Sequence, residues 1–270
     1  MDIDTSTTHW IDAPGGRLFA RCWRPQAPTE DPVRKPPIVL FHDSLGCVEL
    51  WRGFPLRLAD RAGRLVIAYD RLGFGGSDPR TAPPGPRFIQ DEAERFFPAL
   101  RAGLGFDRFV AFGHSVGGAM AAHCAARHPS ACEALVTESA QFFVEDRTRS
   151  GILQAKEQFK TEASFERLRR LHGEKARWVL DAWADTWLSP EFADWTLEEA
   201  LAQVACPTLV IHGSEDEYGS LLHPRQIADR VAGVAQLEIL PGVRHVPHRE
   251  REAWVAQRVA RFLLEPPIQA

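Results

Sequence analysis

Short apolar runs alternate with longer segments of helical periodicity over the first half of the chain. The runs at 38–41, 65–69 and 109–112 have the length and the β-branched and aromatic content of buried strands. The segments 51–62 and 88–103 repeat apolar residues at the spacing of a helix. Strands and helices that alternate in this way predict an α/β fold, with a mostly parallel sheet and helices on both faces.

The two ends of the chain extend the pattern. Residues 8–11 and 17–23 flank a glycine-containing turn at 12–16, so we expect a β-hairpin there. Further strands and helices are expected at 133–138, 208–211, 224–232, 236–240 and 250–264. No internal repeat or low-complexity segment interrupts this order.

The pattern changes in one long stretch, where helical periodicity and dense charge replace the short apolar runs. We interpret residues 140–204 as a helical cap inserted into a core formed by 1–139 and 205–270. Trp183 and Trp187 lie at helical spacing within the cap. Most of its tryptophans are expected to pack in the cap, but these two are candidates for a substrate pocket at the boundary between cap and core.

Composition and charge narrow the classes of partner. The chain has 270 residues, 44% hydrophobic and 25% charged, as a soluble globular protein with a sizeable core does. Its formal net charge of -4 shows no excess of basic residues that would bind nucleic acid or an anionic membrane, so we expect a small-molecule partner. The absence of a signal-like or membrane-spanning run favours a cytoplasmic location. Five scattered cysteines without C-x-x-C spacing are expected to be reduced thiols.

The strongest chemical signal is the pentapeptide Gly-His-Ser-Val-Gly at 113–117. It lies between the strand at 109–112 and an alanine-rich helix, which is the context that G-x-S-x-G requires. A sharp turn there exposes the hydroxyl of Ser115, and the small residues Gly113 and Gly117 allow strand and helix to approach each other. The helix N-terminus behind Ser115 offers backbone N–H groups to a developing oxyanion.

A serine hydroxyl needs a base, and the base needs an orienting group. Asp216 follows the strand at 208–211, and His245 follows the strand at 236–240, so both lie in turns at strand ends. The order Ser, Asp, His is that of the α/β-hydrolases. Glu215, Glu217 and Glu138 are alternative carboxylates, and motif position favours Asp216 over them.

With these motifs, nearly the whole chain resembles the α/β-hydrolase superfamily, in the branch with a late helical cap. The resemblance implies Ser115 as the nucleophile, His245 as general base and acid, and Asp216 as the orienting carboxylate. It also implies an oxyanion hole made by the backbone N–H groups of Ser44 and Val116. One departure is Asp43, which stands where the family usually has glycine.

Other candidate sites are weaker. Gly73-x-Gly75 suggests a dinucleotide loop, but Asp78 replaces the third glycine and a proline-rich segment follows, so we expect no cofactor. Pro247 is expected to prevent an ordinary helix near His248, which argues against a metal pair with His245. We expect no metal site. His114 is expected to pack against or orient the turn, and it is also a candidate for the pocket.

The resulting hypothesis is a carboxylic ester hydrolase that acts on a small, largely apolar substrate through an acyl-enzyme, with water as the second substrate. Serine as nucleophile disfavours the dehalogenase and epoxide-hydrolase branches, which use aspartate. A lactonase, a thioesterase and a carbon-carbon bond hydrolase would share these residues. A different class, a small-molecule receptor on a hydrolase scaffold, would keep them but turn over slowly. The sequence leaves the oligomeric state open.

Overall fold

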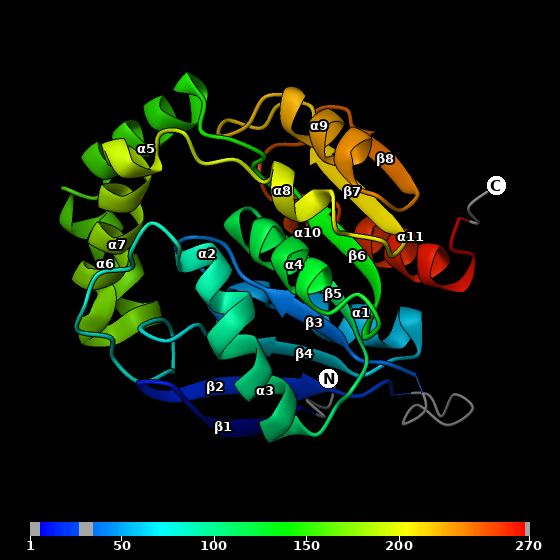
Figure 1. Cartoon of the computed structure of the whole chain (residues 1–270). Coiled ribbons are helices and arrows are strands. Elements are labelled where there is room, and N and C mark those ends of the chain that lie inside the picture. The colour runs from blue at the N-terminus through cyan, green and yellow to red at the C-terminus, as the bar shows by residue number, and fades with distance from the viewer. Residues whose placement is uncertain (1–5, 27–34, 268–270) are drawn as a thin grey trace.

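The computed structural model describes residues 6–26 and 35–267, and within them one mixed sheet organises the molecule (Figure 1). Its eight strands are ordered β1-β2-β4-β3-β5-β6-β7-β8 among the described residues. The strands are β1 (Thr7–Ala13), β2 (Gly16–Trp23), β3 (Ile38–Phe41), β4 (Val66–Tyr69), β5 (Phe109–His114), β6 (Cys132–Glu138), β7 (Thr208–Gly213) and β8 (Ala235–Leu240). β1 and β2 form the predicted hairpin, and β2 pairs antiparallel with β4. All pairs from β4 to β8 are parallel, as predicted.

Helices cover both faces of this sheet. They are α1 (Phe54–Ala62), α2 (Phe88–Asp91), α3 (Phe97–Leu104), α4 (Val116–Arg127), α5 (Asp146–Gln158), α6 (Glu162–His172), α7 (Ala176–Leu188), α8 (Glu198–Leu201), α9 (Leu222–Arg230), α10 (Pro247–Glu250) and α11 (Glu252–Leu264). Short 3₁₀ turns lie at Val48–Trp51, Gly173–Lys175 and Pro190–Phe192. α1 and α11 pack on one core, and α2, α3, α4 and α9 pack on the other.

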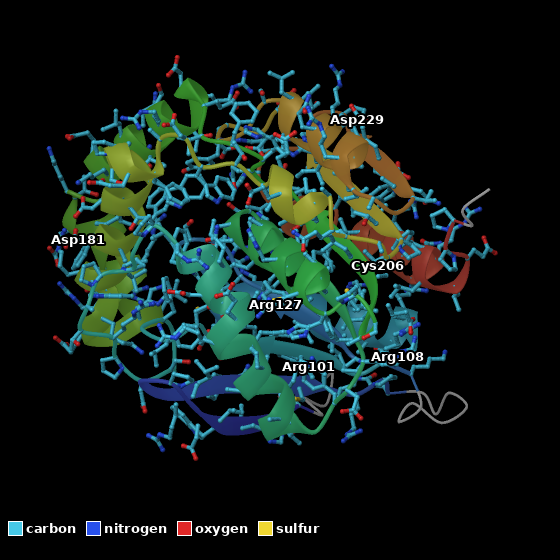
Figure 2. The ribbon with its side chains drawn as sticks, viewed as in Figure 1. Arg101, Arg108, Arg127, Asp181, Cys206 and Asp229 are labelled. Atoms are coloured by element: carbon cyan, nitrogen blue, oxygen red, sulfur yellow. The ribbon has the colours of Figure 1, made fainter. Side chains whose placement is uncertain are left out.

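The central strand and the helix that follows it are almost wholly buried. Every residue of β5 is buried, and so are nine residues of α4, most of them glycine or alanine. Small side chains let the helix approach the strand closely. Charged side chains instead cover the outside of the molecule, as Asp229 on α9 illustrates (Figure 2).

The inserted cap consists of α5, α6 and α7, which stack beside one end of the sheet between β6 and β7 in the chain (Figure 1). The helical insertion predicted from sequence is therefore present, while its limits at 140 and 204 stay a prediction. His172 joins the cap to the core, because its Nδ1 accepts from the N–H of Gly75 at 2.9 Å and its Nε2 donates to the carbonyl of Leu45 at 3.0 Å. Burial lowers the pKa of His172 to about 4, so the ring makes these bonds as a neutral group.

Two prolines refine the expected elements. The helix expected at 88–103 contains a π-helical turn at Glu92–Phe96, next to Pro98, which lies in the first turn of α3. Proline has no N–H to donate, and a π turn absorbs such a break. The expectation at Pro247 was wrong: α10 begins there, because the fixed φ of proline suits the first helical position.

Among the described residues, none of the helices combines the length and the apolar composition needed to cross a bilayer. The five cysteines are all buried and free. They are thus free thiols, as the sequence suggested, and their side chains lie in the core.

Candidate active site

Ser115 occupies a strained turn between β5 and α4. Its φ of 56° and ψ of -128° lie in a region that residues other than glycine rarely adopt. The turn needs close backbone approaches on both sides. A Cβ on Gly113 would lie 2.0 Å from the carbonyl oxygen of Gly117, and one on Gly117 would lie 2.1 Å from the carbonyl oxygen of Phe41. Glycine is thus required at both positions.

Asp216 and His245 form a hydrogen-bonded pair in the loops after β7 and β8. The Nδ1 of His245 lies 2.8 Å from Oδ2 and 2.9 Å from Oδ1 of Asp216. Backbone N–H groups of Tyr218 and Gly219 donate to Oδ1 at 2.8 and 3.0 Å. Burial alone would raise the pKa of Asp216, but His245, His212 and the N–H of Tyr218 lower it to about 2. An ionised carboxylate only accepts hydrogen bonds, so Nδ1 carries the proton and Nε2 is left as the basic nitrogen.

The competing carboxylates have other partners. Glu217 accepts hydrogen bonds from the guanidinium of Arg244 at 3.1 Å and from the N–H of His245 at 3.2 Å. Glu138 faces His248 instead of His245. Of these groups, Asp216 is the carboxylate that contacts the ring of His245.

Ser115 and His245 open onto one cavity of about 110 Å³ between core and cap. Its walls come from the loop after β3, the strand ends and the cap helices. They comprise Asp43, Ser44, Leu45, Ser115, Gln141, Thr148, Ile152, Trp183, Trp187, Tyr218 and His245. Both candidate tryptophans lie there, whereas His114 does not. Mostly apolar walls with a few convergent polar groups are typical of small-molecule sites.

Gln141 is a polar wall residue that the sequence reasoning missed. The Oγ of Ser115 lies 3.4 Å from its Oε1, and no hydrogen bond joins Oγ to His245 in the described residues. A hydrogen bond between a serine nucleophile and its base often forms only when substrate is bound. Gln141 lies shortly after the end of β6, as Asp216 lies shortly after the end of β7. This position at a strand end is the sequence signal that could have identified Gln141 as a residue of the site.

The loop after β3 carries the candidate oxyanion donor. Ser44 lines the cavity, and Val116 is the first residue of α4, so its N–H has no acceptor within the helix. The Oδ1 of Asp43 accepts from the N–H of Leu45 at 3.0 Å, which closes a local turn around Ser44. The family's usual glycine could not make this bond. Here the side chain of Asp43 holds the turn around Ser44 by a hydrogen bond.

His114 lies behind the turn of Ser115 and joins two loops of the site. Its Nε2 donates to the carbonyl of His245 at 2.8 Å, and its Nδ1 lies 3.4 Å from Oδ2 of Asp43. Both partners are acceptors, which favours the ring with a proton on each nitrogen. Burial opposes this charge, but Asp43 and Glu138 raise the pKa of His114 above its usual value. Its place suits orientation of the site better than contact with substrate.

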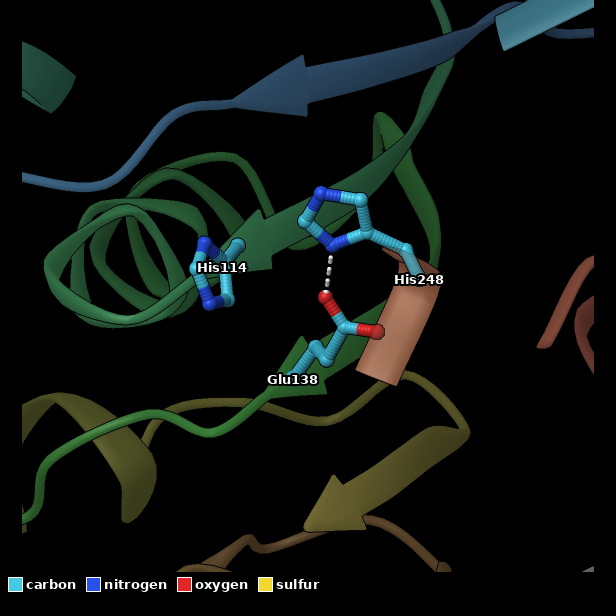
Figure 3. Close-up of side chains that lie close together, drawn as sticks. All are labelled: His114, Glu138 and His248. Atoms are coloured by element: carbon cyan, nitrogen blue, oxygen red, sulfur yellow. Dashed lines mark hydrogen bonds and ion pairs between the residues drawn. The ribbon is translucent and has the colours of Figure 1, made fainter. Parts of the chain in front are cut away.

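One cluster has the residue types of a metal site. Ligand atoms of His114, Glu138 and His248 lie within 4.8 Å of one another, and all three side chains are buried (Figure 3). The Nδ1 of His248 donates to Oε2 of Glu138 at 2.5 Å. Both ring nitrogens of His114 are engaged by Asp43 and His245. An ion would have to replace these hydrogen bonds, which already hold the cluster together.

Comparison with known proteins adds a family and several relatives. The family model described as alpha/beta hydrolase fold matches residues 36–252. The 1-acylglycerol-3-phosphate O-acyltransferase of Homo sapiens is 35% identical over 109 residues, which cover 38% of this chain and 29% of the relative. The match therefore spans less than a third of that relative's length.

Solved structures resemble nearly the whole chain. A serine hydrolase involved in carbazole degradation superposes with a TM-score of 0.74 at 19% identity, over 96% of this chain and 99% of the other. The enol-lactonase from Burkholderia xenovorans LB400 gives a TM-score of 0.71 at 21% identity, over 95% and 100% of the two chains. At such identities the similarity shows the fold.

Proposed function

The chain belongs to the alpha/beta hydrolase fold family, and from this membership we propose that it is a serine hydrolase that cleaves a carboxylic ester-type bond of a small, largely apolar substrate. One observation carries the proposal: Ser115 and His245 line one cavity, and Asp216 is hydrogen-bonded to the ring of His245. A nucleophile, a base and an orienting carboxylate are the parts that acyl transfer needs.

The proposed reaction has two acyl-transfer steps. The Oγ of Ser115 attacks the ester carbonyl while Nε2 of His245 takes its proton. The backbone N–H groups of Ser44 and Val116 stabilise the tetrahedral oxyanion. The C–O bond to the alcohol then breaks, and His245 returns the proton to the leaving oxygen. Water attacks the acyl-enzyme in the same way, which releases the acid and restores Ser115.

The walls of the cavity support an apolar substrate. Ile152, Trp183 and Trp187 face it, so an aliphatic or aromatic group loses water-exposed surface on binding. Lactone, thioester and carbon-carbon substrates would use the same groups. They are alternatives that a substrate panel separates.

The direct test is hydrolysis of p-nitrophenyl esters from acetate to decanoate by the wild type and Ser115→Ala. Ser150→Ala, an exposed serine of α5, is the matched control. We expect turnover by the wild type and the control, and a loss of at least about 10³-fold in Ser115→Ala, because the nucleophile is gone. The preferred chain length would report the size of the acyl pocket.

Full activity in Ser115→Ala would reject the proposal. Inactivity of the wild type on esters, combined with turnover of lactones or thioesters, would reassign the bond that is cleaved. Tight binding of apolar esters without turnover would favour the receptor hypothesis.

A further inference from the structure

A second cavity lies beside the loop of Ser44, and we propose that it binds a carboxylate carried by the substrate. This inference rests on the proposed function, which it makes more specific. The ligand groups are the guanidinium groups of Arg71 and Arg80. The substrate would be an ester with a largely apolar chain that ends in a carboxylate.

The second cavity borders the catalytic one. Its walls are Ser44, Arg71, Leu72, Phe74, Arg80, Pro84, Phe88, Glu92, Phe96, Met120, Trp178, Ala182, Trp183 and Trp187. Ser44, Trp183 and Trp187 line both cavities. One substrate can therefore place its carbonyl at Ser115 and extend past these shared residues. The cavity volume of about 30 Å³ equals roughly two water-sized spheres, which suits the two oxygens of a carboxylate.

Arg71 is a buried cation that makes no direct ion pair among the described residues, although Glu92 and Asp43 lie near enough to raise its pKa. Its side chain is 7% exposed, and its Nη2 donates to the carbonyl of Asp43 at 2.7 Å. The guanidinium lies over the ring of Phe74, 4.1 Å from its centre. No carboxylate of the described residues lies within 4.0 Å of it as an ion pair. Burial accordingly lowers the pKa of Arg71. Buried arginines are normally paired, so this one favours an anionic ligand.

Arg80 adds a second cation to the same wall. Its guanidinium lies 6.0 Å from the ring centre of Phe96, and it forms no ion pair within 4.0 Å in the part of the chain that the structure describes. Burial lowers the pKa of Arg80 as well. Arg71 keeps hydrogen bonds to the carbonyl of Asp43 and, at 3.4 Å, to Nε2 of His42. Neither arginine has a carboxylate of the described residues within 4.0 Å, and both line a small, aromatic-lined space.

Glu92 is the acidic residue among the lining residues, so its carboxylate has to be weighed against the two arginines. It is buried and accepts a hydrogen bond from the hydroxyl of Tyr69 at 2.7 Å. Burial raises its pKa, against the lowering effect of Tyr69, Arg71 and Arg80. Among the lining residues two arginines face this one carboxylate, so the cavity favours an anionic group such as a carboxylate over a cation.

The test compares charged and neutral versions of one substrate. The probes are the mono-p-nitrophenyl esters of the C6 to C8 linear dicarboxylic acids, each beside its methyl-capped neutral counterpart. Arg80→Gln removes one cation without touching Ser44 or Asp43. Arg95→Gln is the matched control, because Arg95 is an exposed arginine beside the same Phe96 ring but outside the cavity.

We expect the wild type to prefer the charged ester at one chain length or more. Arg80→Gln should lose about tenfold in kcat/KM on that charged ester, as expected for one charge-assisted hydrogen bond, with little change on its neutral counterpart. Arg95→Gln should keep the wild-type preference, and Glu92→Gln should increase it. Equal preference in the wild type and Arg80→Gln, or an equal loss in Arg95→Gln, would overturn the proposal.

A binding measurement separates this proposal from the proposed function. Titration calorimetry of the free C6 to C8 diacids with Ser115→Ala requires no turnover. Binding that is weakened by an added Arg80→Gln supports the carboxylate subsite even if no ester is hydrolysed. Hydrolysis of neutral esters without any binding of the diacids would keep the hydrolase and reject the subsite.

Discussion

Two histidine–carboxylate pairs lie at the same end of the sheet and differ in what surrounds them. Asp216 pairs with His245 at 2.8 Å, and Glu138 pairs with His248 at 2.5 Å. Both carboxylates are at or just beyond the end of a parallel strand, and both histidines follow β8. The first pair opens onto the cavity that contains Ser115, while the second is sealed inside the protein.

The sealed pair is enclosed by aromatic rings. The ring of His248 lies 4.6 Å from that of Trp51 and 5.4 Å from that of Phe54, measured between centres. Burial lowers the pKa of His248, so it donates to Glu138 as a neutral ring. Burial alone would raise the pKa of Glu138, but His248 and the charge of His114 lower it. A similar pair thus serves stability in one place and is available for chemistry in the other.

The largest expected difference between the pairs is in turnover. His245→Gln should lower kcat by about 10⁴- to 10⁶-fold, because it removes the base that the proposed mechanism assigns to the proton of Ser115. His248→Gln should keep most of the turnover of each folded molecule. Rates on a p-nitrophenyl ester, normalised to folded protein by circular dichroism, measure both, with the exposed His9→Gln as control. Equal losses in the two variants would show that the sealed pair also takes part in the reaction.

The second difference is in stability, and here the larger effect is expected from the sealed pair of Glu138 and His248. His248→Gln should lower the free energy of unfolding by about 3 kcal/mol, because the amide of glutamine reaches the position of Nε2, and the buried carboxylate of Glu138 loses its donor at Nδ1. Urea unfolding measures this loss. The double variant with Glu138→Gln should recover part of it, since the unpaired charge is removed as well. A double variant no more stable than His248→Gln would contradict the pair's role.

The smallest expected effect is on the acid limb, which is the fall in the free energy of unfolding as the pH is lowered. The pKa of Asp216 is lowered to about 2 in the fold, below its usual 3.8. Its ionised form therefore stabilises the fold above pH 4, and this stabilisation disappears as the pH falls to 2. Asp216→Asn should remove about 2 kcal/mol at pH 7 and flatten that limb. Asp229→Asn, exposed on α9, should leave the limb as it is (Figure 2). An unchanged slope in Asp216→Asn would refute the assignment.

Much of the fold and the main chemical groups could be predicted from local sequence. Apolar runs such as 38–41 and 109–112 became buried parallel strands, because a run of that length can bury itself on both faces only inside such a sheet. The glycines at 113 and 117 marked the turn of Ser115, because no side chain fits between its close backbones. Motif order led to Asp216 and His245.

Other features depend on contacts between distant segments. Gln141 meets Ser115, and His114 links Asp43 to the loop of His245, yet no spacing rule connects these positions. The cavity that contains Arg71 also depends on distant segments, because its walls come from loops, from α2 and the π turn after it, from α4 and from the cap helix α7.

The sequence by itself determined the order of strands and helices, the serine turn and the residue types of the site, since periodicity and backbone sterics act over a few residues. Only the tertiary structure decided which histidine faces the cavity. His245 and His248 are three residues apart and both have a carboxylate partner, so motif order favoured His245 but residue type alone does not show which ring is enclosed. Packing does: His248 lies against Trp51 and Phe54, while His245 faces the space left between core and cap.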